Sequence, residues 1–140
     1  AELHPEVARR HRDHLVEKNM ASSLTATGLG PWLRERGIDT LTVVGYMTHN
    51  CDDATVRQAM HEGWKVELLH DAAGSLPYAN SLGTATAEEI HRVFTIVMHT
   101  GFATVVSTEE WLKALASGEA LEADNVFLSN QRALAGRGTP

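Results

Sequence analysis

Short apolar segments alternate along this chain with segments whose apolar residues recur at helical spacing. The clearest extended segment, residues 40–45, is β-branched and mostly apolar, which is typical of a buried strand. The clearest helical stripe is formed by Ile90, Val93, Phe94, Val97 and Met98. The whole pattern predicts strands at residues 14–18, 40–45, 64–70 and 102–106, and helices that end at Gly37, Gly63, Gly101 and Gly118.

Two of these helices carry a capping box at their start, Thr86 with Glu89 and Ser107 with Glu110. Residues 72–85 are rich in glycine, serine, proline and asparagine, which predicts a loop. Alternating strands and helices with short connections indicate an α/β domain whose parallel strands are joined by right-handed crossovers. Ligands bind such sheets at the carboxyl ends of the strands, so the residues just after each predicted strand are the candidates for function.

Length and composition set the class of protein. The 140 residues predict one domain over residues 1–118, with residues 119–140 as a tail or an arm across an oligomer interface. A hydrophobic fraction of 43% and a charged fraction of 21% are those of a globular protein. The formal net charge of −6 argues against a nucleic-acid binder, and no apolar run approaches the roughly 20 residues that span a bilayer. The single cysteine forbids an internal disulfide and favours a reducing, cytoplasmic setting.

Cys51 is the candidate nucleophile. It follows the predicted strand at residues 40–45 and comes just before or within the first turn of a predicted helix, where free N–H groups favour a thiolate. Lys18 ends a neighbouring predicted strand and adds a positive charge, whereas the two aspartates after the cysteine oppose a thiolate. A lone cysteine is also common as a small buried packing residue, and that alternative stays open. Asp71, after the third predicted strand, is expected to cap or brace the following loop.

The residues around this cysteine carry a resemblance to a known family. The run Gly45-Tyr-Met-Thr-His-Asn-Cys-Asp-Asp-Ala-Thr55 has the pattern Gly-x-x-Thr-x-x-Cys, with a threonine four residues further on. Val16-Glu17-Lys18 resembles the family's strand that ends in lysine, and Asp71-Ala72 resembles the end of another. Together these motifs, over residues 3–115, resemble the isochorismatase-like cysteine hydrolases, in particular the amidohydrolase branch with nicotinamidase and streptothricin hydrolase. The resemblance implies a Rossmann-like three-layer parallel sheet.

The resemblance also implies a mechanism. Family members hydrolyse C–N bonds of amides and related compounds through a cysteine thioester, whereas the true isochorismatases, which cleave an enol ether, do not rely on this cysteine. Cys51 matches the nucleophile and Lys18 the lysine of an Asp–Lys–Cys triad. The peptide between Tyr46 and Met47 matches a position that is commonly cis, and the backbone N–H groups of Met47 and Cys51 match an oxyanion hole. Candidate pocket residues are Tyr46, Thr48, His49 and Trp32, and neither a cofactor nor a metal is expected.

The triad aspartate has no match in this sequence. In the family it ends the first strand, whereas Asp13, the only aspartate before Lys18, precedes the lysine strand. The resemblance therefore implies that the first two strands and first helix of the family, about 50–60 residues, are supplied by another chain, were cut off, or are not represented here. The expected partners are a small-molecule amide substrate, an N-terminal complementing segment that carries the aspartate, and further copies of this chain.

Three functions stay open on the sequence alone. The first is a cysteine amidohydrolase acting on a small amide or lactam. The second is a catalytically incomplete structural or assembly unit without its aspartate. The third keeps the fold and makes Cys51 a redox sensor.

Overall fold

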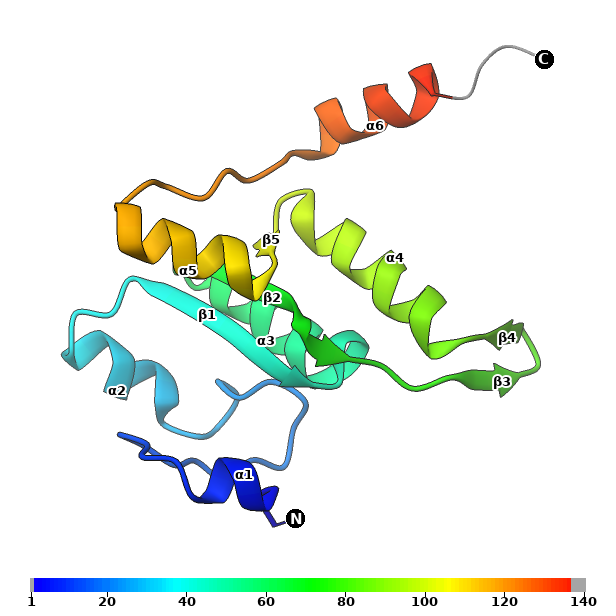
Figure 1. The fold of residues 1–140 in the computed structure, drawn as a ribbon. Helices are drawn as coiled ribbons and strands as arrows, with labels where there is room; N and C mark the ends of the chain where they lie inside the picture. Colours follow the sequence, from blue (N-terminus) through cyan, green and yellow to red (C-terminus); the bar gives the residue numbers. More distant parts are fainter. Residues whose placement is uncertain (1, 137–140) are drawn as a thin grey trace.

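A computed structural model describes residues 2–136 of the protein (Figure 1). The helices and strands follow one another in this order: α1 (Pro5–Ala8), α2 (Leu29–Glu35), β1 (Thr40–Tyr46), the π-helical turn η1 (Thr48–Asp52), α3 (Asp53–His61), β2 (Lys65–Gly74), β3 (Tyr78–Asn80), β4 (Gly83–Ala85), α4 (Ala87–His99), β5 (Thr104–Val106), α5 (Thr108–Ser117) and α6 (Val126–Ala135). The predicted α/β class is confirmed.

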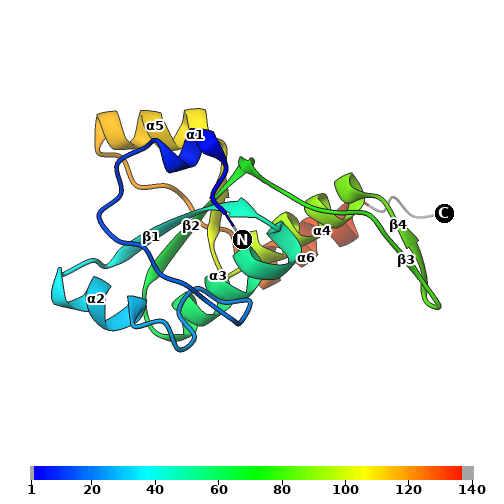
Figure 2. The same cartoon turned by 90° about the horizontal axis from the view of Figure 1, so that it is seen from below.

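Three parallel strands form the central sheet in the order β1–β2–β5. Side chains alternate between the two faces of a strand, so Val66 and Leu68 of β2 are buried on one face while Glu67 points to the other. On that second face Glu67 accepts hydrogen bonds from the Trp111 indole N–H of α5 at 2.9 Å and from the Thr42 hydroxyl at 2.7 Å. Helix α5 covers this face and α3 covers the other, so the domain has three layers (Figure 2).

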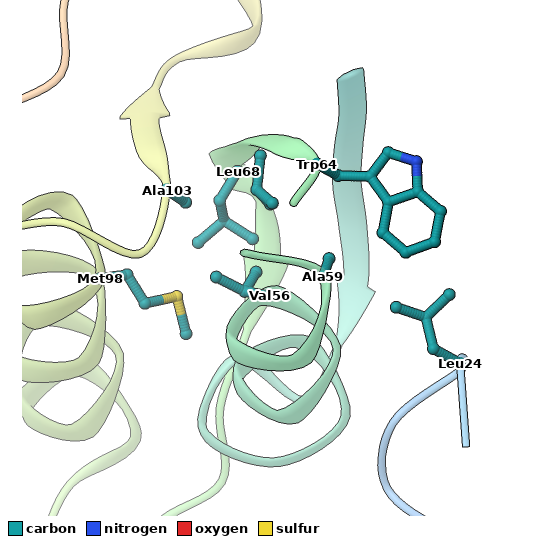
Figure 3. Packing of buried hydrophobic residues seen from close by; sticks show 8 residues of the cluster. Leu24, Val56, Ala59, Trp64, Leu68, Met98 and Ala103 are labelled. Carbon is teal, nitrogen blue, oxygen red and sulfur yellow. The ribbon is translucent and has the colours of Figure 1, made fainter. Parts of the chain in front are cut away.

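The hydrophobic core lies between β2, α3 and α4. Val56 of α3, Leu68 of β2 and Met98 of α4 have no exposed surface, and they meet in the centre of the core (Figure 3). Trp64 closes the core beside Leu24, and its indole N–H donates to the Ile38 carbonyl at 3.0 Å. This packing fixes α3 against the sheet and, with it, the turn that precedes α3.

Helix starts were well predicted by local sequence. Both capping boxes form: the Thr86 side chain accepts from the Glu89 N–H and the Ser107 side chain from the Glu110 N–H, and each glutamate accepts in return from its cap residue. These bonds satisfy N–H groups that the first turn of a helix leaves free.

The strand predicted at residues 14–18 is wrong. These residues have no regular secondary structure and belong to no strand of the described structure. A strand needs a neighbour to accept and donate its backbone hydrogen bonds, and among residues 2–136 no strand lies beside this segment. The segment is held through side chains instead, since His14 stacks on Trp32 with ring centroids 4.5 Å apart.

The loop predicted at residues 72–85 is also partly wrong. Strand β2 continues to Gly74, and β3 and β4 then form an antiparallel hairpin that extends beyond α4 (Figures 1 and 2). The turn between them is closed by Asn80, whose side chain accepts from the Leu82 N–H at 2.9 Å, and by Gly83, which has a φ of +137°. Strands of three residues are too short to show the alternation by which strands are recognised.

The C-terminal tail contains a helix that the sequence pattern did not predict. Helix α6 follows an irregular segment and stands apart from the sheet in Figure 1. Its Val126, Phe127 and Leu128 are exposed, and residues 137–140 of the predicted tail lie outside the described residues. Among the described helices, none has the length and apolar character needed to cross a membrane.

The core predicts a clear contrast between two leucines. Leu68→Ala removes a side chain with no exposed surface, so we expect the free energy of unfolding to fall by about 2–5 kcal/mol because a cavity remains. The matched change Leu82→Ala, at a hairpin tip that is 96% exposed, is expected to cost less than about 0.5 kcal/mol. Urea denaturation of both variants measures the difference; equal effects would contradict the assignment of the core.

Candidate active site

Cys51 lies where the sequence predicted it, after β1 and at the start of a helix. It belongs to the turn Thr48–Asp52, which continues without a break into α3. Its side chain is half-buried and is a free thiol. Because Val56 and Ala59 are fully buried in the core, the helix cannot shift, and Cys51 is presented at the carboxyl end of the sheet, where ligands bind in folds of this kind.

Lys18 lies beside this cysteine. Its ammonium group is 3.3 Å from the sulfur of Cys51 and donates to the backbone carbonyls of Met20 at 3.1 Å and Ala21 at 2.9 Å. The three contacts use all three N–H groups of the ammonium. Since a positive charge beside sulfur stabilises its anionic form, the pair suits a nucleophilic thiolate.

The Thr55 hydroxyl joins the lysine segment to the cysteine turn. It donates to the backbone carbonyl of Cys51 at 2.7 Å and accepts from the Ser23 N–H at 3.0 Å. One turn further along α3, the Thr25 hydroxyl donates to Gln58 at 2.8 Å. Thr55 is the threonine four residues after the cysteine in the sequence motif, and the structure shows that it connects the two halves of the site.

Asp52 introduces an opposing charge. Its side chain is buried, with 4% of the residue exposed, and Oδ2 has no hydrogen-bond partner among the described residues. Burial raises the pKa of Asp52 to about 6, and the nearby Lys18 charge lowers it in part. Above this pH the carboxylate opposes a second negative charge on the adjacent cysteine.

Residues 46–48 connect β1 to the cysteine turn. The Tyr46–Met47 peptide is cis, the geometry expected at this position. The Met47 carbonyl accepts from the N–H groups of Asn50 at 3.0 Å and Asp52 at 3.2 Å, whereas the Met47 N–H has no acceptor within residues 2–136. Thr48 is fully buried, and its hydroxyl lies 3.0 Å from the Gly74 carbonyl and 2.8 Å from Nδ1 of His91. This arrangement leaves the Met47 N–H free to donate to a bound molecule.

His49 makes contacts that sequence reasoning missed. Its Nδ1 is 3.0 Å from the Ser75 hydroxyl and its Nε2 is 2.7 Å from the Tyr78 hydroxyl. The Tyr78 hydroxyl also contacts the Met47 sulfur at 4.0 Å. Tyr78 pairs with Ala85 across a short hairpin, which lies inside the segment predicted as a loop.

Two other residues singled out from the sequence lie in different surroundings. The Trp32 ring is stacked with His14 and carries the Arg36 guanidinium 3.9 Å from its centroid, so its known contacts are with these two residues. Asp71 caps α5: its Oδ1 accepts from both the N–H and the hydroxyl of Thr108 at 2.8 Å, and these bonds lower the pKa of Asp71. The sequence predicts that Asp71 caps or braces the loop after its own strand, whereas it lies within β2 and binds the first residue of α5.

Comparison with known proteins identifies the family. The isochorismatase domain matches residues 1–110, and the chain therefore belongs to the isochorismatase domain family. A crystal structure of a candidate isochorismatase from Burkholderia xenovorans LB400 is 57% identical, with a TM-score of 0.96 over 99% of this chain and 67% of that one. A cysteine hydrolase from Pseudomonas syringae pv. phaseolicola is 28% identical, with a TM-score of 0.79 over 84% of this chain and 56% of that one. The predicted isochorismatase-like hydrolase fold is confirmed.

Relatives by sequence belong to the same family. YddQ of Bacillus subtilis, an uncharacterised isochorismatase family protein, is 33% identical over 112 residues, which are 80% of this chain and 62% of YddQ. Nicotinamidase 3 of Arabidopsis thaliana is 29% identical over 74% of this chain and 47% of its own length. Streptothricin hydrolase of Streptomyces noursei is 39% identical over 51% of this chain and 26% of its own length. The chain thus spans less than two thirds of each of these relatives.

Removing the Lys18 charge is expected to slow the reaction of Cys51 with iodoacetamide. In Lys18→Met, we expect the rate at pH 7 to fall about tenfold, because an ammonium this close to sulfur contributes roughly 1–2 kcal/mol at a partly exposed site. Intact-mass spectrometry follows the label, and Cys51 is the one cysteine that it can modify. Lys65→Met, at the opposite end of the sheet, is the control and should react as the wild type does; equal rates for all three proteins would refute the ammonium–sulfur pair.

Asp52→Asn is expected to stabilise the protein at neutral pH. The folded pKa of Asp52 is about 6 against an ordinary value of 3.8, so the folded state binds the proton more tightly and loses stability as pH rises between these values. The difference corresponds to about 3 kcal/mol at most. We expect the gain in Asp52→Asn to be full at pH 8 and absent below pH 4, as measured by urea denaturation.

The neighbouring Asp53→Asn variant is the matched control for this measurement. Asp53 accepts from Arg57 at 2.9 Å, so its loss should lower stability slightly at pH 8. A gain of the same size in both variants would show that the effect does not come from burial of Asp52.

Proposed function

We propose that the protein is a cysteine amidohydrolase that cleaves the C–N bond of a small amide or lactam through a thioester on Cys51. The observation that carries the proposal is the 3.3 Å contact between the Lys18 ammonium and the Cys51 sulfur. Family membership supports it, because nicotinamidase and streptothricin hydrolase are among the relatives and a cysteine hydrolase is among the similar structures. Tyr46, Thr48, His49 and Trp32 remain the proposed pocket residues.

The proposed reaction has two steps. The Cys51 thiolate attacks the amide carbonyl carbon, a C–S bond forms, and the carbonyl electron pair moves to oxygen. The backbone N–H groups of Met47 and Cys51 would stabilise this oxyanion. The C–N bond then breaks, the amine leaves with the proton taken from the thiol, and the remaining thioester is hydrolysed by water to the acid and free cysteine.

The carboxylate that carries this proton is assigned to a complementing N-terminal segment. Among the described residues, β1 pairs with β2 along one edge and with no strand along the other. A further parallel strand at that free edge would end beside Cys51, because parallel strands share their carboxyl end.

We also propose that the chain forms homo-oligomers, for which the exposed apolar residues of α6 offer a surface. We further propose that it works in the cytoplasm, where a free thiol persists.

Loss of the sulfur is the direct test of this function. The protein, together with the complementing N-terminal segment, is incubated with a panel of small primary amides and lactams, and ammonia release or ring opening is measured together with the intact mass. We expect turnover with an acyl adduct on Cys51, and a fall of at least about 1000-fold in Cys51→Ala because the nucleophile is gone. Ser117→Ala, which also removes the single atom beyond Cβ but at the C-terminal end of α5, is the control and should retain full activity.

Other outcomes would favour the alternatives. Turnover that survives in Cys51→Ala would exclude the thioester mechanism. A peroxide-dependent mass increase at Cys51 without any amide turnover would indicate a redox sensor. Absence of both reactions would indicate a structural or assembly unit.

A further inference from the structure

The hairpin β3–β4 reaches back to the cysteine turn through one hydroxyl group. The Tyr78 hydroxyl lies at the first residue of β3 and contacts two residues of the segment that leads to Cys51: Nε2 of His49 at 2.7 Å and the Met47 sulfur at 4.0 Å. The two rings of Tyr78 and His49 meet edge to face, with centroids 5.1 Å apart and an angle of 83°. The contact therefore has both a polar and an aromatic component.

The His49 ring has little freedom in this position. Its second nitrogen, Nδ1, is 3.0 Å from the Ser75 hydroxyl, and Phe94 of α4 lies edge-on with centroids 6.0 Å apart. Since both ring nitrogens have partners, the ring cannot rotate without breaking a hydrogen bond. Loss of the Tyr78 hydroxyl would leave Nε2 without this partner and would release the Met47 side chain on the same side.

Met47 matters because of its backbone. Its N–H has no acceptor within the described part of the chain, and the proposed function makes this N–H a donor to the substrate oxyanion. Thr48, the next residue, is fixed by its own buried contacts with Gly74 and His91. The Met47 carbonyl is held by the N–H groups of Asn50 and Asp52, and the Tyr78 hydroxyl contacts its side chain from the hairpin side at 4.0 Å.

We infer that Tyr78 is a positioning residue that, together with His49, holds Met47 so that its N–H is directed at the substrate oxygen. This inference rests on the proposed function, because it assigns Tyr78 a part in the same oxyanion hole. It adds a residue from a separate element, since Tyr78 lies on the hairpin and not on the cysteine turn. A donor must lie within about 2.7–3.1 Å of the developing oxyanion to be effective, so small displacements of Met47 weaken it.

Two reactions of Cys51 separate the oxyanion hole from the nucleophile. With iodoacetamide, the thiolate attacks the carbon that bears iodine, a C–S bond forms and iodide leaves, so no oxyanion forms and the rate reports on the thiolate alone. With benzaldehyde, the thiolate attacks the carbonyl carbon, a C–S bond forms, the carbonyl pair moves to oxygen, and the oxygen then takes a proton from water. Benzaldehyde labelled with ¹³C at the carbonyl distinguishes this tetrahedral hemithioacetal from the trigonal imines of lysines by NMR.

We expect loss of the Tyr78 hydroxyl to weaken the reaction with benzaldehyde and to leave the reaction with iodoacetamide nearly unchanged. In Tyr78→Phe, which keeps the ring, we expect the hemithioacetal to form with about fivefold lower affinity, because a displaced Met47 N–H would lose one hydrogen bond to its oxygen. The iodoacetamide rate should stay within about twofold of the wild type. Thr84→Val removes a hydroxyl from the opposite strand of the same hairpin, one without a hydrogen bond in the described structure, and should change neither reaction.

The outcomes distinguish the inference from the function on which it rests. Equal hemithioacetal affinity in Tyr78→Phe and the wild type overturns the inference alone. Equal losses in both reactions also overturn it, because Tyr78 would then act on the nucleophile or on the fold. If wild-type Cys51 reacts with iodoacetamide but forms no hemithioacetal, the proposed oxyanion hole fails as well.

Discussion

The packing of α3 against β2 is the constraint on which the site depends. Val56 of α3 and Leu68 of β2 have no exposed surface, and together with Met98 they fix the position of the helix along the sheet. Because the cysteine turn is continuous with α3, the position of the Cys51 sulfur is set by this core and not by the loops around it. The other parts of the site, the lysine segment and the hairpin, are attached to this helix and the turn before it by side-chain contacts.

Two charged side chains lie near the Cys51 sulfur, that of Lys18 from a distant part of the chain and that of Asp52 from the next residue. They differ in their exposure and in their hydrogen bonds. Lys18 is exposed, but two carbonyls and the sulfur use all its donors. Asp52 is buried and has an oxygen without a partner among the described residues. An exposed charge is weakened by solvent, whereas a buried carboxylate is costly and tends to take up a proton. The balance at Cys51 therefore changes with pH through Asp52, while the contribution of Lys18 depends on the segment that holds it.

Sequence reasoning predicted the parts of this structure that are encoded by short segments. The strand before Cys51, the helix after it and both capping boxes depend on residues close together in the chain, whereas Asp71 binds Thr108, 37 residues further on. The pairing of Lys18 with Cys51 was predicted from the family resemblance, because no local pattern relates two residues so far apart in the chain. The contacts of His49 could not be predicted, because Ser75 and Tyr78 lie in a segment whose short strands give no periodic signal. The strand predicted at residues 14–18 failed for a related reason: its composition is suitable, but a strand exists only with a partner.

The contact between Tyr78 and His49 affects both the hairpin and the segment that leads to Cys51. A two-stranded hairpin has little stability of its own, and Leu82 at its tip is almost fully exposed. The bond from Tyr78 to His49 is therefore one of the interactions that hold the hairpin to the domain, just as it restrains Met47. Elements with few buried contacts open locally at low cost in free energy, so opening of the hairpin would break the Tyr78 contacts with His49 and Met47 while α3 stays folded. A site built in this way keeps Cys51 fixed by the core and leaves the proposed oxyanion donor, the Met47 N–H, dependent on a peripheral element.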